Sequence, residues 1–330
     1  MREVAALADV SVKTVSRVVN DERTVDPELA GRVREAIGML GYRRDDAASA
    51  LRRADRVSSS IGLVFEDVAN PFLSYVHRAI EDVARARGVL TFAGSADERP
   101  DLERELALAF CARRIDGLIV VPAGTDHSYL ARERDAGIAL VFVDRPPAFL
   151  DADTVLSDNE EATASAILGM AERGHRRIAF LCDRAELYTA RTRLQGYRDA
   201  LAALGLPEDP GLVRSNVANP ASTDAAVREL FALADPPTAL FTGQNMITTA
   251  TLHTLRALRL HHSVAIIGFD DFELADLLDP PVTVVAQDVA ELGRTAAELL
   301  FARIDGDTSP TRRVVVPTRL IERGSGEIPA

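Results

Sequence analysis

The sequence contains no tryptophan, only two cysteines and few histidines among its 330 residues. Cys111 and Cys182 stand far apart, so no disulfide framework is expected. The six histidines show no metal-ligand spacing, and neither a metal nor another cofactor is expected. No apolar run approaches the roughly 20 residues that a membrane-spanning helix needs. The first residues also lack the basic-then-apolar pattern of a secretion signal, so we expect a cytoplasmic protein without membrane contact.

Negative charge dominates the chain, but it is unevenly distributed. The formal net charge is −12, whereas residues 1–57 carry 11 basic and 10 acidic side chains and sum to +1. The acidity therefore belongs to the remainder of the chain, which sums to −13. A nearly neutral N-terminal segment still binds a polyanion if its cations share one face.

The first 42 residues predict three short helices. Ser11 is a suitable N-cap for the second helix, and Asp26 followed by Pro27 is typical of the start of the third, which Gly41 ends. The positions expected to face the core are Val4, Leu7 and Ala8, then Val12, Val15 and Val19, and finally Leu29, Val33, Ile37 and Leu40.

Three short helices with a tight turn between the first two indicate a helix-turn-helix unit. The second helix of such a unit enters the major groove of DNA, which is about as wide as an α-helix. Its polar residues are of the types that reach phosphates and base edges: Lys13, Thr14, Ser16, Arg17 and Asn20. The alternative is a small amphipathic bundle whose polar face is merely solvated.

The segment "EVAALADVSVKTVSRVVN" resembles the DNA-reading segment of the lac repressor/gal repressor family of bacterial transcription regulators. The core pattern "VSxxTVSRVxN" matches from Val10 to Asn20. The resemblance implies contacts to phosphates and bases from Ser11, Thr14, Ser16, Arg17 and Asn20. It also implies that Val12 and Lys13 carry most of the operator selectivity, since a lysine suits a guanine edge and a valine a thymine methyl group.

Two departures from the family pattern concern the start of the chain. Asp9 stands where the family usually has a glycine in the turn. Aspartate tolerates a positive φ, so we expect the turn to form. The family's usual lead-in before the first helix is missing, and we expect the natural start a few residues upstream.

Residues 43–60, "RRDDAASALRRADRVSSS", predict a linker. Its charge and its alanine and serine content are compatible with a flexible tether. The family resemblance instead implies a hinge helix that enters the minor groove when a dimer sits on its operator. Leu51 would then wedge into the central base step, with Arg52 and Arg53 facing phosphates.

The remainder of the chain alternates between continuous apolar runs and amphipathic segments. The runs include "IGLVFE", "VLTFAGS", "DGLIVVPA", "IALVFVDR", "RRIAFLC", "TALFTG" and "VAIIGFDD". Such runs are typical of strands buried on both faces of a parallel sheet. Helical patterns such as "PDLERELALAFCARR" lie between them. The alternation predicts a doubly wound α/β fold, and about ten strands predict two lobes because one sheet rarely holds so many.

Polar residues gather after six of the predicted strands, where ligands of such folds bind. These groups are Asn70 to Phe72, Asp144 and Arg145, Thr189 to Arg193, Gln244 and Asn245, Asp270 and Asp271, and Gln287 and Asp288. One polar strand end would be unremarkable, but six together indicate a cleft. For Asp144 and Asp270, helix capping is the alternative role.

This half also resembles the effector-binding core of the same family, which is similar to periplasmic sugar-binding proteins. The motifs that carry the resemblance are "NPF", "VDR", "SDN", "GHRRIAFL", "RxxGY", "GFDD" and "PPxTxxxQD". It implies a helix-turn-helix domain at 1–42, a hinge at 43–60 and a core at 61–330, with an N-lobe at about 61–156 and 289–314 and a C-lobe at about 157–286 and 315–330. The implied ligand contacts are Phe72, Asp144, Thr189, Arg193, Gln244, Asp270 and Gln287.

These residue types suit a sugar or sugar derivative. Carboxylates accept from adjacent hydroxyls, an arginine donates two parallel bonds and a phenylalanine offers a ring face. The family's usual carboxylate is replaced at Gln244-Asn245, and its usual aromatic residue is replaced in the stretch "NPAS" at 219–222. A smaller, different or anionic ligand, or a nucleobase, is therefore the alternative.

We expect a homodimeric repressor that binds a near-palindromic operator under the control of this effector. The helix over residues 71–86 offers Phe72, Leu73, Val76 and Ile80 either to a dimer partner or to its own sheet. A plain solute-binding protein is the first alternative. No nucleophile elbow, phosphate-binding glycine loop or metal set is present, and we expect neither catalytic residues nor enzymatic activity. An Asp270-Asp271 acid/base pair is disfavoured because neighbouring residues at a strand end point in different directions.

Overall fold

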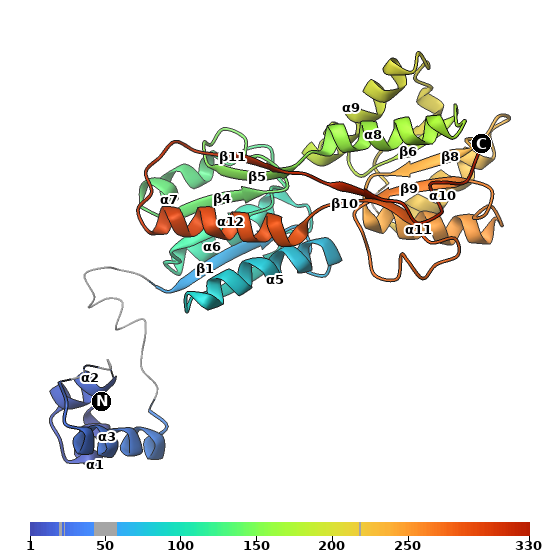
Figure 1. Ribbon diagram of the computed structural model, residues 1–330. Coiled ribbons are helices and arrows are strands. Elements are labelled where there is room, and N and C mark those ends of the chain that lie inside the picture. The colour runs from blue at the N-terminus through green and yellow to red at the C-terminus, as the bar shows by residue number, and fades with distance from the viewer. Residues whose placement is uncertain (20–21, 23, 43–57, 218) are drawn as a thin grey trace. The chain divides into compact units, whose positions relative to one another are not determined.

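The structure is a computed structural model that describes residues 1–19, 22, 24–42, 58–217 and 219–330. Contacts divide the chain into two compact units, Met1–Ser58 and Ser59–Ala330 (Figure 1). Among the described residues, no helix combines the length and the apolar character that crossing a bilayer requires.

The N-terminal unit contains the predicted helices α1 (Arg2–Ala8), α2 (Val12–Val19) and α3 (Pro27–Leu40). Their predicted caps are confirmed. The Ser11 hydroxyl accepts a hydrogen bond from the Thr14 amide at 3.0 Å, and the Asp26 carboxylate accepts from the amides of Glu28 and Leu29. Gly41 ends α3 in the left-handed conformation, with φ of 56°.

The turn between α1 and α2 forms without glycine. Asp9 adopts the left-handed conformation with φ of 49°, as the sequence predicted. The Arg32 side chain of α3 donates hydrogen bonds to the backbone carbonyl oxygens of Ala8 at 2.5 Å and Asp9 at 3.4 Å. These bonds attach the turn to the third helix and so hold α2 in place.

The core of this unit differs in part from the predicted stripes. Its buried residues are Val4, Ala5, Ala8, Val15, Val18, Ala30, Val33 and Ala36. The prediction was wrong for Leu7, Val12 and Leu40, whose exposed fractions are 51%, 44% and 44%. Val12 is the first residue of α2 and lies beyond the contact with the other helices. Small alanines occupy core positions on α1 and α3, where they permit a close approach of the helices.

The second unit consists of alternating strands and helices. Its strands are β1 (Ser60–Phe65), β2 (Leu90–Ser95), β3 (Gly117–Val120), β4 (Ala139–Val143), β5 (Asp153–Ser157), β6 (Ile178–Leu181), β7 (Val213–Arg214), β8 (Ala239–Thr242), β9 (Ala265–Phe269), β10 (Thr283–Ala286), β11 (Arg313–Val316) and β12 (Arg319–Ile321). Its helices are α5 (Pro71–Ala86), α6 (Pro100–Ala112), η1 (Ser128–Leu130), α7 (Ala131–Asp135), α8 (Asn159–Glu172), α9 (Tyr188–Ala203), η2 (Pro210–Leu212), α10 (Pro220–Phe231), α11 (Asn245–Ala257) and α12 (Val289–Ile304).

The strands form two six-stranded sheets, as the two-lobed α/β prediction requires (Figure 1). The strand order is β11-β5-β4-β3-β1-β2 in the first lobe and β12-β10-β9-β8-β6-β7 in the second. All neighbouring strands are parallel except β12, which runs antiparallel to β10. The expectation of two purely parallel sheets is corrected at this edge, where the chain returns directly from β11 through a short connection.

Helices cover both faces of each sheet and bury the apolar strand runs. In the first lobe, α5 and α12 enclose one cluster with the sheet, and α6 lies over the other. In the second lobe, α8 and α9 cover one face, and α10 and α11 the other. The strand β2 is an exception to the prediction of full burial, because Leu90 and Phe92 on this edge strand are 66% and 45% exposed.

The chain passes between the lobes after β5, after β10 and after β11. At the first two crossings, the Ser157 hydroxyl donates a hydrogen bond to the side-chain oxygen of Gln287. At the third, the Thr318 amide donates to the Asp158 carboxylate at 2.8 Å. Because β11 extends to Val316, this crossing comes slightly later than the family resemblance implied. Hydrogen bonds thus connect the three crossing segments, which together form the hinge between the lobes.

The apolar residues proposed for a dimer surface on α5 are instead part of the lobe core. Phe72, Leu73, Val76 and Ile80 are all buried in the cluster that α5 forms with the sheet and α12. The alternative of packing on the sheet is confirmed, and these four side chains do not offer a surface to a partner. On the same helix, Tyr75 is 50% exposed.

Candidate functional site

The exposed face of α2 carries the residues expected to read DNA. Ser11, Val12 and Lys13 are exposed, and Thr14, Ser16 and Arg17 are partly exposed. The hydroxyl groups of Ser11 and Thr14 lie 2.9 Å apart, and the Arg17 guanidinium lies 3.6 Å from the Glu22 carboxylate. The remaining predicted DNA contacts, Asn20, Leu51 and Arg52, lie outside the described residues.

A small cavity of about 30 Å³ lies between the two lobes of the second unit. The structure brings all the predicted effector residues together around it: Phe72, Asp144, Thr189, Arg193, Gln244, Asp270 and Gln287. The cavity is also lined by residues outside that prediction: Glu66, Asn70, Leu73, Arg145, Asp183, Ala190 and Gly243. Two of these, Asn70 and Arg145, belong to polar strand ends that the sequence had pointed out.

Asp144 and Asp270 occupy equivalent places in the two lobes. Each follows the apolar run of a central strand, and their φ angles of 68° and 70° are left-handed. Each backbone N–H donates to a neighbouring strand, to Val155 and Val285 respectively, at 2.9 Å. Both residues are buried, and neither is the N-cap residue of a helix in the described chain. The Asp270 carboxylate does accept from the backbone N–H of Asn245, so it also contacts the N-terminus of α11. Both carboxylates line the cavity.

The Asp270 carboxylate accepts a hydrogen bond from the Gln287 side-chain amide at 2.7 Å. Burial raises the pKa of Asp270, and the nearby Arg193 guanidinium opposes this shift. The Asp144 carboxylate has one oxygen, Oδ1, that is buried without a hydrogen-bond partner. Its other oxygen lies 3.4 Å from Nε of Arg145. Asp144 therefore retains an unused acceptor at the cavity.

Arg193 is the central cation of the second lobe. Its Nε donates to the Asn159 side-chain oxygen at 2.7 Å, and Nη1 donates to the Gly243 carbonyl oxygen at 2.5 Å. The guanidinium also lies 3.6 Å from the centroid of the Phe269 ring, a cation–π contact. Burial lowers the pKa of Arg193, although Asp270 and Asp144 oppose the shift. These contacts fix the direction of the guanidinium, so the group is already oriented before a ligand binds.

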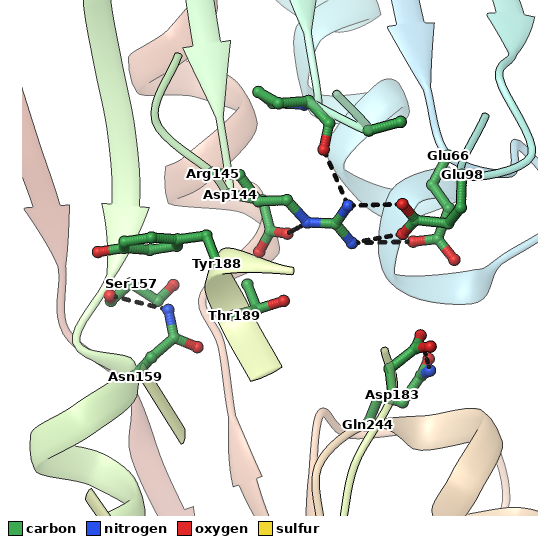
Figure 2. Close-up of polar contacts among 12 residues, drawn as sticks. Glu66, Glu98, Asp144, Arg145, Ser157, Asn159, Asp183, Tyr188, Thr189 and Gln244 are labelled. Atoms are coloured by element: carbon green, nitrogen blue, oxygen red, sulfur yellow. Dashed lines mark hydrogen bonds and ion pairs between the residues drawn. The ribbon is translucent and has the colours of Figure 1, made fainter. Parts of the chain in front are cut away.

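Arg145 is held by a group of carboxylates in the first lobe (Figure 2). Its two terminal nitrogens lie 2.6 and 2.9 Å from the Glu98 carboxylate, and Nη1 also donates to the Pro122 carbonyl oxygen at 2.9 Å. The Glu66 carboxylate lies 3.4 Å away. Burial alone lowers the pKa of Arg145, but Glu98 and the other acids more than compensate and raise it.

Glu98 and Asp183 connect this group to the second lobe. The Arg184 side chain donates to the Glu98 carboxylate at 3.0 Å and to the Glu98 carbonyl oxygen at 2.9 Å. The Gln244 side-chain amide donates to the Asp183 carboxylate at 2.7 Å, as Figure 2 shows. Carboxylate oxygens of Glu66, Glu98 and Asp183 all lie within 4.8 Å of one another.

Glu66 and Asp183 were not predicted, although each is the first acidic residue after a buried strand run. The same signal identified Asp144 and Asp270, so it would have found both. Burial, with Glu98 and Asp183 nearby, raises the pKa of Glu66 to about 8. Burial likewise raises the pKa of Asp183. The nearby arginines thus offset the negative charge of these carboxylates only in part.

The remaining predicted residues surround the cavity at helix starts and at the hinge. Phe72 lies in the first turn of α5, which Asn70 caps by accepting from the Phe72 amide at 3.1 Å. Thr189 lies in the first turn of α9. Gln287 lies at a crossing between the lobes and bonds both Ser157 and Asp270. A ligand at this site would therefore contact both lobes and the hinge.

The neighbouring Asp271 does not share the cavity with Asp270. Its two carboxylate oxygens each accept a hydrogen bond from the Arg323 guanidinium at 2.7 Å. The two aspartates therefore point in different directions, as the sequence argument expected of an Asp-Asp pair at a strand end. The donors and acceptors of the cavity suit binding of a polar molecule.

Two family models match the chain. Residues 1–45 match the bacterial regulatory proteins of the lacI family, and residues 169–326 match the periplasmic binding protein-like domain. The transcriptional regulator CelR of Thermobifida fusca is 34% identical, over 98% of this chain and 97% of its own length. The ribose operon repressor of Escherichia coli is 31% identical, over 98% of this chain and 99% of its own length.

Solved structures of similar proteins have the same fold. The complex of CelR with cellobiose has a TM-score of 0.73 and 32% sequence identity, and the alignment covers 98% of each chain. The lac repressor dimer bound to operator and the anti-inducer ONPF has a TM-score of 0.85 over 98% of this chain and 97% of its own. At 22% identity, the latter likeness concerns the fold alone.

Proposed function

Since the chain belongs to the lacI family of bacterial regulatory proteins, we propose that it represses transcription by binding operator DNA under the control of a small molecule. One observation carries the proposal. A helix-turn-helix unit with an exposed polar helix and an interlobe cavity lined by buried charged side chains occur in the same chain. The first accounts for DNA recognition and the second for its control.

The DNA contacts follow from the exposed face of α2. Lys13 and Val12 carry most of the base selectivity. Phosphates and bases are also contacted by Ser11, Thr14, Ser16, Arg17 and Asn20. A homodimer places two such helices in successive major grooves, so its operator is nearly palindromic. Leu51 and Arg52 belong to the hinge that enters the minor groove between them.

The effector is a sugar or a sugar derivative. Support comes from the ligand of the CelR structure, cellobiose, and from the name of the ribose operon repressor. It also comes from the cavity, where Asp144 and Asp270 accept from hydroxyl groups, Arg193 donates to ring oxygens and Phe72 offers an apolar edge. A ligand that binds the two lobe arrangements unequally shifts their populations and thereby changes operator affinity.

No catalytic role is part of this proposal. The family consists of regulatory proteins. The residues that line the cavity supply hydrogen-bond donors and acceptors, and the proposed binding involves no covalent step. We place the protein in the cytoplasm, where its DNA is.

The test is binding of the purified full-length chain to the DNA upstream of its own gene, titrated with a panel of sugars and nucleosides. Salt-sensitive binding that one compound strengthens or weakens is expected. Failure to bind DNA would leave a solute-binding role as the better assignment.

A further inference from the structure

The interlobe cavity continues outward into a larger cleft. This outer cleft has a volume of about 500 Å³ and shares Glu66, Asn70, Asp183 and Gln244 with the inner cavity. Because these four residues line both, the two spaces form one site that reaches from Asp270 to the surface. A ligand bound to the inner residues therefore extends a second group into the outer cleft.

The outer cleft is strongly acidic. Among the described residues that line it, the carboxylates are Glu66, Asp67, Asp97, Glu98 and Asp183, and the cation is Arg184. The N-terminal ends of α5, α10 and α11 border the cleft and offset part of this charge, since a helix N-terminus carries roughly half a positive charge. The cleft remains anionic, and this disfavours the anionic effector that the sequence had left open.

Arg145 and Arg184 are held largely by the protein itself, although the Nε atom of Arg145 is buried without a hydrogen-bond partner. Arg145 spans Glu98 and the Pro122 carbonyl oxygen, and Arg184 binds Glu98 from the second lobe. Unused acceptors remain instead. Asp144, which is only 6% exposed, has a buried carboxylate oxygen without a partner at the inner cavity. Carboxylates therefore outnumber arginines around the two spaces, so a positive charge on the ligand would find partners here.

On the basis of the proposed regulatory function, we propose that the effector carries a protonated amino group, as in an amino sugar or another aminated polyol. Its hydroxyl groups bind the inner residues, and its ammonium group binds between the carboxylates of Glu66 and Asp183. These two side chains come from opposite lobes, so the ammonium group links the lobes across the cleft.

Binding of a cation next to Glu66 also moves a proton. The pKa of Glu66 is raised to about 8 by burial and by its acidic neighbours Glu98 and Asp183. The carboxyl group is therefore mostly protonated at pH 7. An ammonium group that binds beside it replaces the proton, which passes to the buffer. A neutral polyol makes no such exchange.

The test compares matched ligands by calorimetry on the full-length chain at pH 7 and constant ionic strength. One series is glucosamine, glucose, N-acetylglucosamine and glucose 6-phosphate. The second is the smaller pair 2-amino-1,3-propanediol and glycerol. We expect each amine to bind at least tenfold more tightly than its neutral partner, and to release protons when buffers of different ionisation enthalpy are compared.

The variant Glu66→Gln keeps the size of the side chain and removes the charge. It should reduce the advantage of the amine to less than threefold and abolish proton release. Glu105→Gln removes one exposed carboxylate of α6 outside the cleft and should retain both effects. A neutral, acetylated or anionic ligand that binds as tightly as the amine overturns the proposal. So does an amine advantage that survives in Glu66→Gln, or failure of both amines to bind.

Operator binding is measured on the same preparation, so that the two proposals are tested separately. If the chain binds DNA and a neutral or anionic compound alone changes that affinity, the regulatory function stands and the amine is excluded. If the chain binds no DNA while the amines bind as expected, the regulatory function fails and the ligand class stands.

Discussion

At the residue scale, substitution of Lys13 distinguishes a contact to base edges from a contact to the phosphate backbone. This lysine is exposed at the start of α2. A lysine that contacts a guanine edge discriminates between bases, whereas one that contacts a phosphate strengthens all DNA binding equally. Lys13→Ala should therefore cost about 1–3 kcal/mol on the preferred operator and much less on unrelated DNA.

Fluorescence anisotropy with operator variants measures this difference. Arg34→Ala, which removes an exposed cation from α3, is the control and should leave the ratio of operator to unrelated DNA unchanged. An equal loss on every sequence in the Lys13 variant would identify a phosphate contact instead.

The Glu66 carboxyl group makes stability depend on pH. Its pKa is raised to about 8 in the folded chain, whereas an unfolded chain ionises near the ordinary value of 4.5. Between these values the folded state holds more protons, so this group lowers stability as pH rises. Glu66→Gln cannot ionise and loses this slope. Relative to the wild type, the variant should gain about 3–4 kcal/mol between pH 5 and pH 8.

Urea unfolding at both pH values checks this expectation. Glu105→Gln, at an exposed position, should follow the wild type at each pH. A Glu66 variant with the wild-type pH slope would show that this carboxyl group is ionised at neutral pH.

At the element scale, local patterns predicted most of the strands and where polar residues follow them, but β5, β7, β11 and β12 were not among the predicted runs. Asp144 and Asp270 could be placed at a cleft because each ends a long apolar run, and parallel strands end at one edge. The partners of these residues could not be predicted. Glu98, which holds Arg145, comes from the loop after β2, and the Ser157–Gln287 bond joins two crossings far apart in the chain. Such pairs depend on strand order, which no local pattern encodes.

The same limit explains the errors in burial. Leu90 and Phe92 belong to an apolar run that resembles its neighbours, but β2 is an edge strand and exposes them. Val12 fits the apolar face of α2 but lies at its first position, outside the helix contacts. In both cases the residue type is typical of a core, but the position of the element or residue in the fold leaves the side chain exposed.

The contact between α8 and α9 depends on one glycine. A Cβ atom at position 196 would lie 2.1 Å from the carbonyl oxygen of Glu160, which belongs to the backbone and cannot swing aside. Gly196→Ala should therefore force the helices apart and destabilise the second lobe by about 2–3 kcal/mol. Thermal unfolding of the purified variant measures this effect.

Gly169→Ala on the partner helix is the matched control. A Cβ atom there meets only the end of the Arg173 side chain at 3.5 Å. This substitution should stabilise the protein by about 0.5–1 kcal/mol, because glycine is less favourable than alanine inside a helix. Equal unfolding temperatures for the two variants would contradict the close approach of α8 and α9.

At the scale of the whole effector-binding unit, a few side chains connect the lobes across the cleft. Asn245, the first residue of α11, donates from its side-chain nitrogen to the side-chain oxygen of Asn70 at 3.1 Å. Asn245 is buried, and it is not among the residues that line the cavity. A second bond, from the Tyr75 hydroxyl to Glu273 at 3.2 Å, is exposed to solvent. Both favour the closed arrangement, and the first is partly buried whereas the second is exposed.

Asn245→Ala removes the partly buried bond without leaving its partner unpaired, because the Asn70 oxygen still accepts from the Phe72 amide. Such a hydrogen bond contributes about 0.5–1.5 kcal/mol, so the closed population should fall and the apparent ligand affinity should weaken about three- to tenfold. Calorimetry with the effector measures this change, and operator affinity should shift as well because one equilibrium governs both. Tyr75→Phe should change ligand affinity less than about twofold, since water replaces an exposed bond. Unchanged ligand affinity in Asn245→Ala would mean that lobe closure does not limit binding.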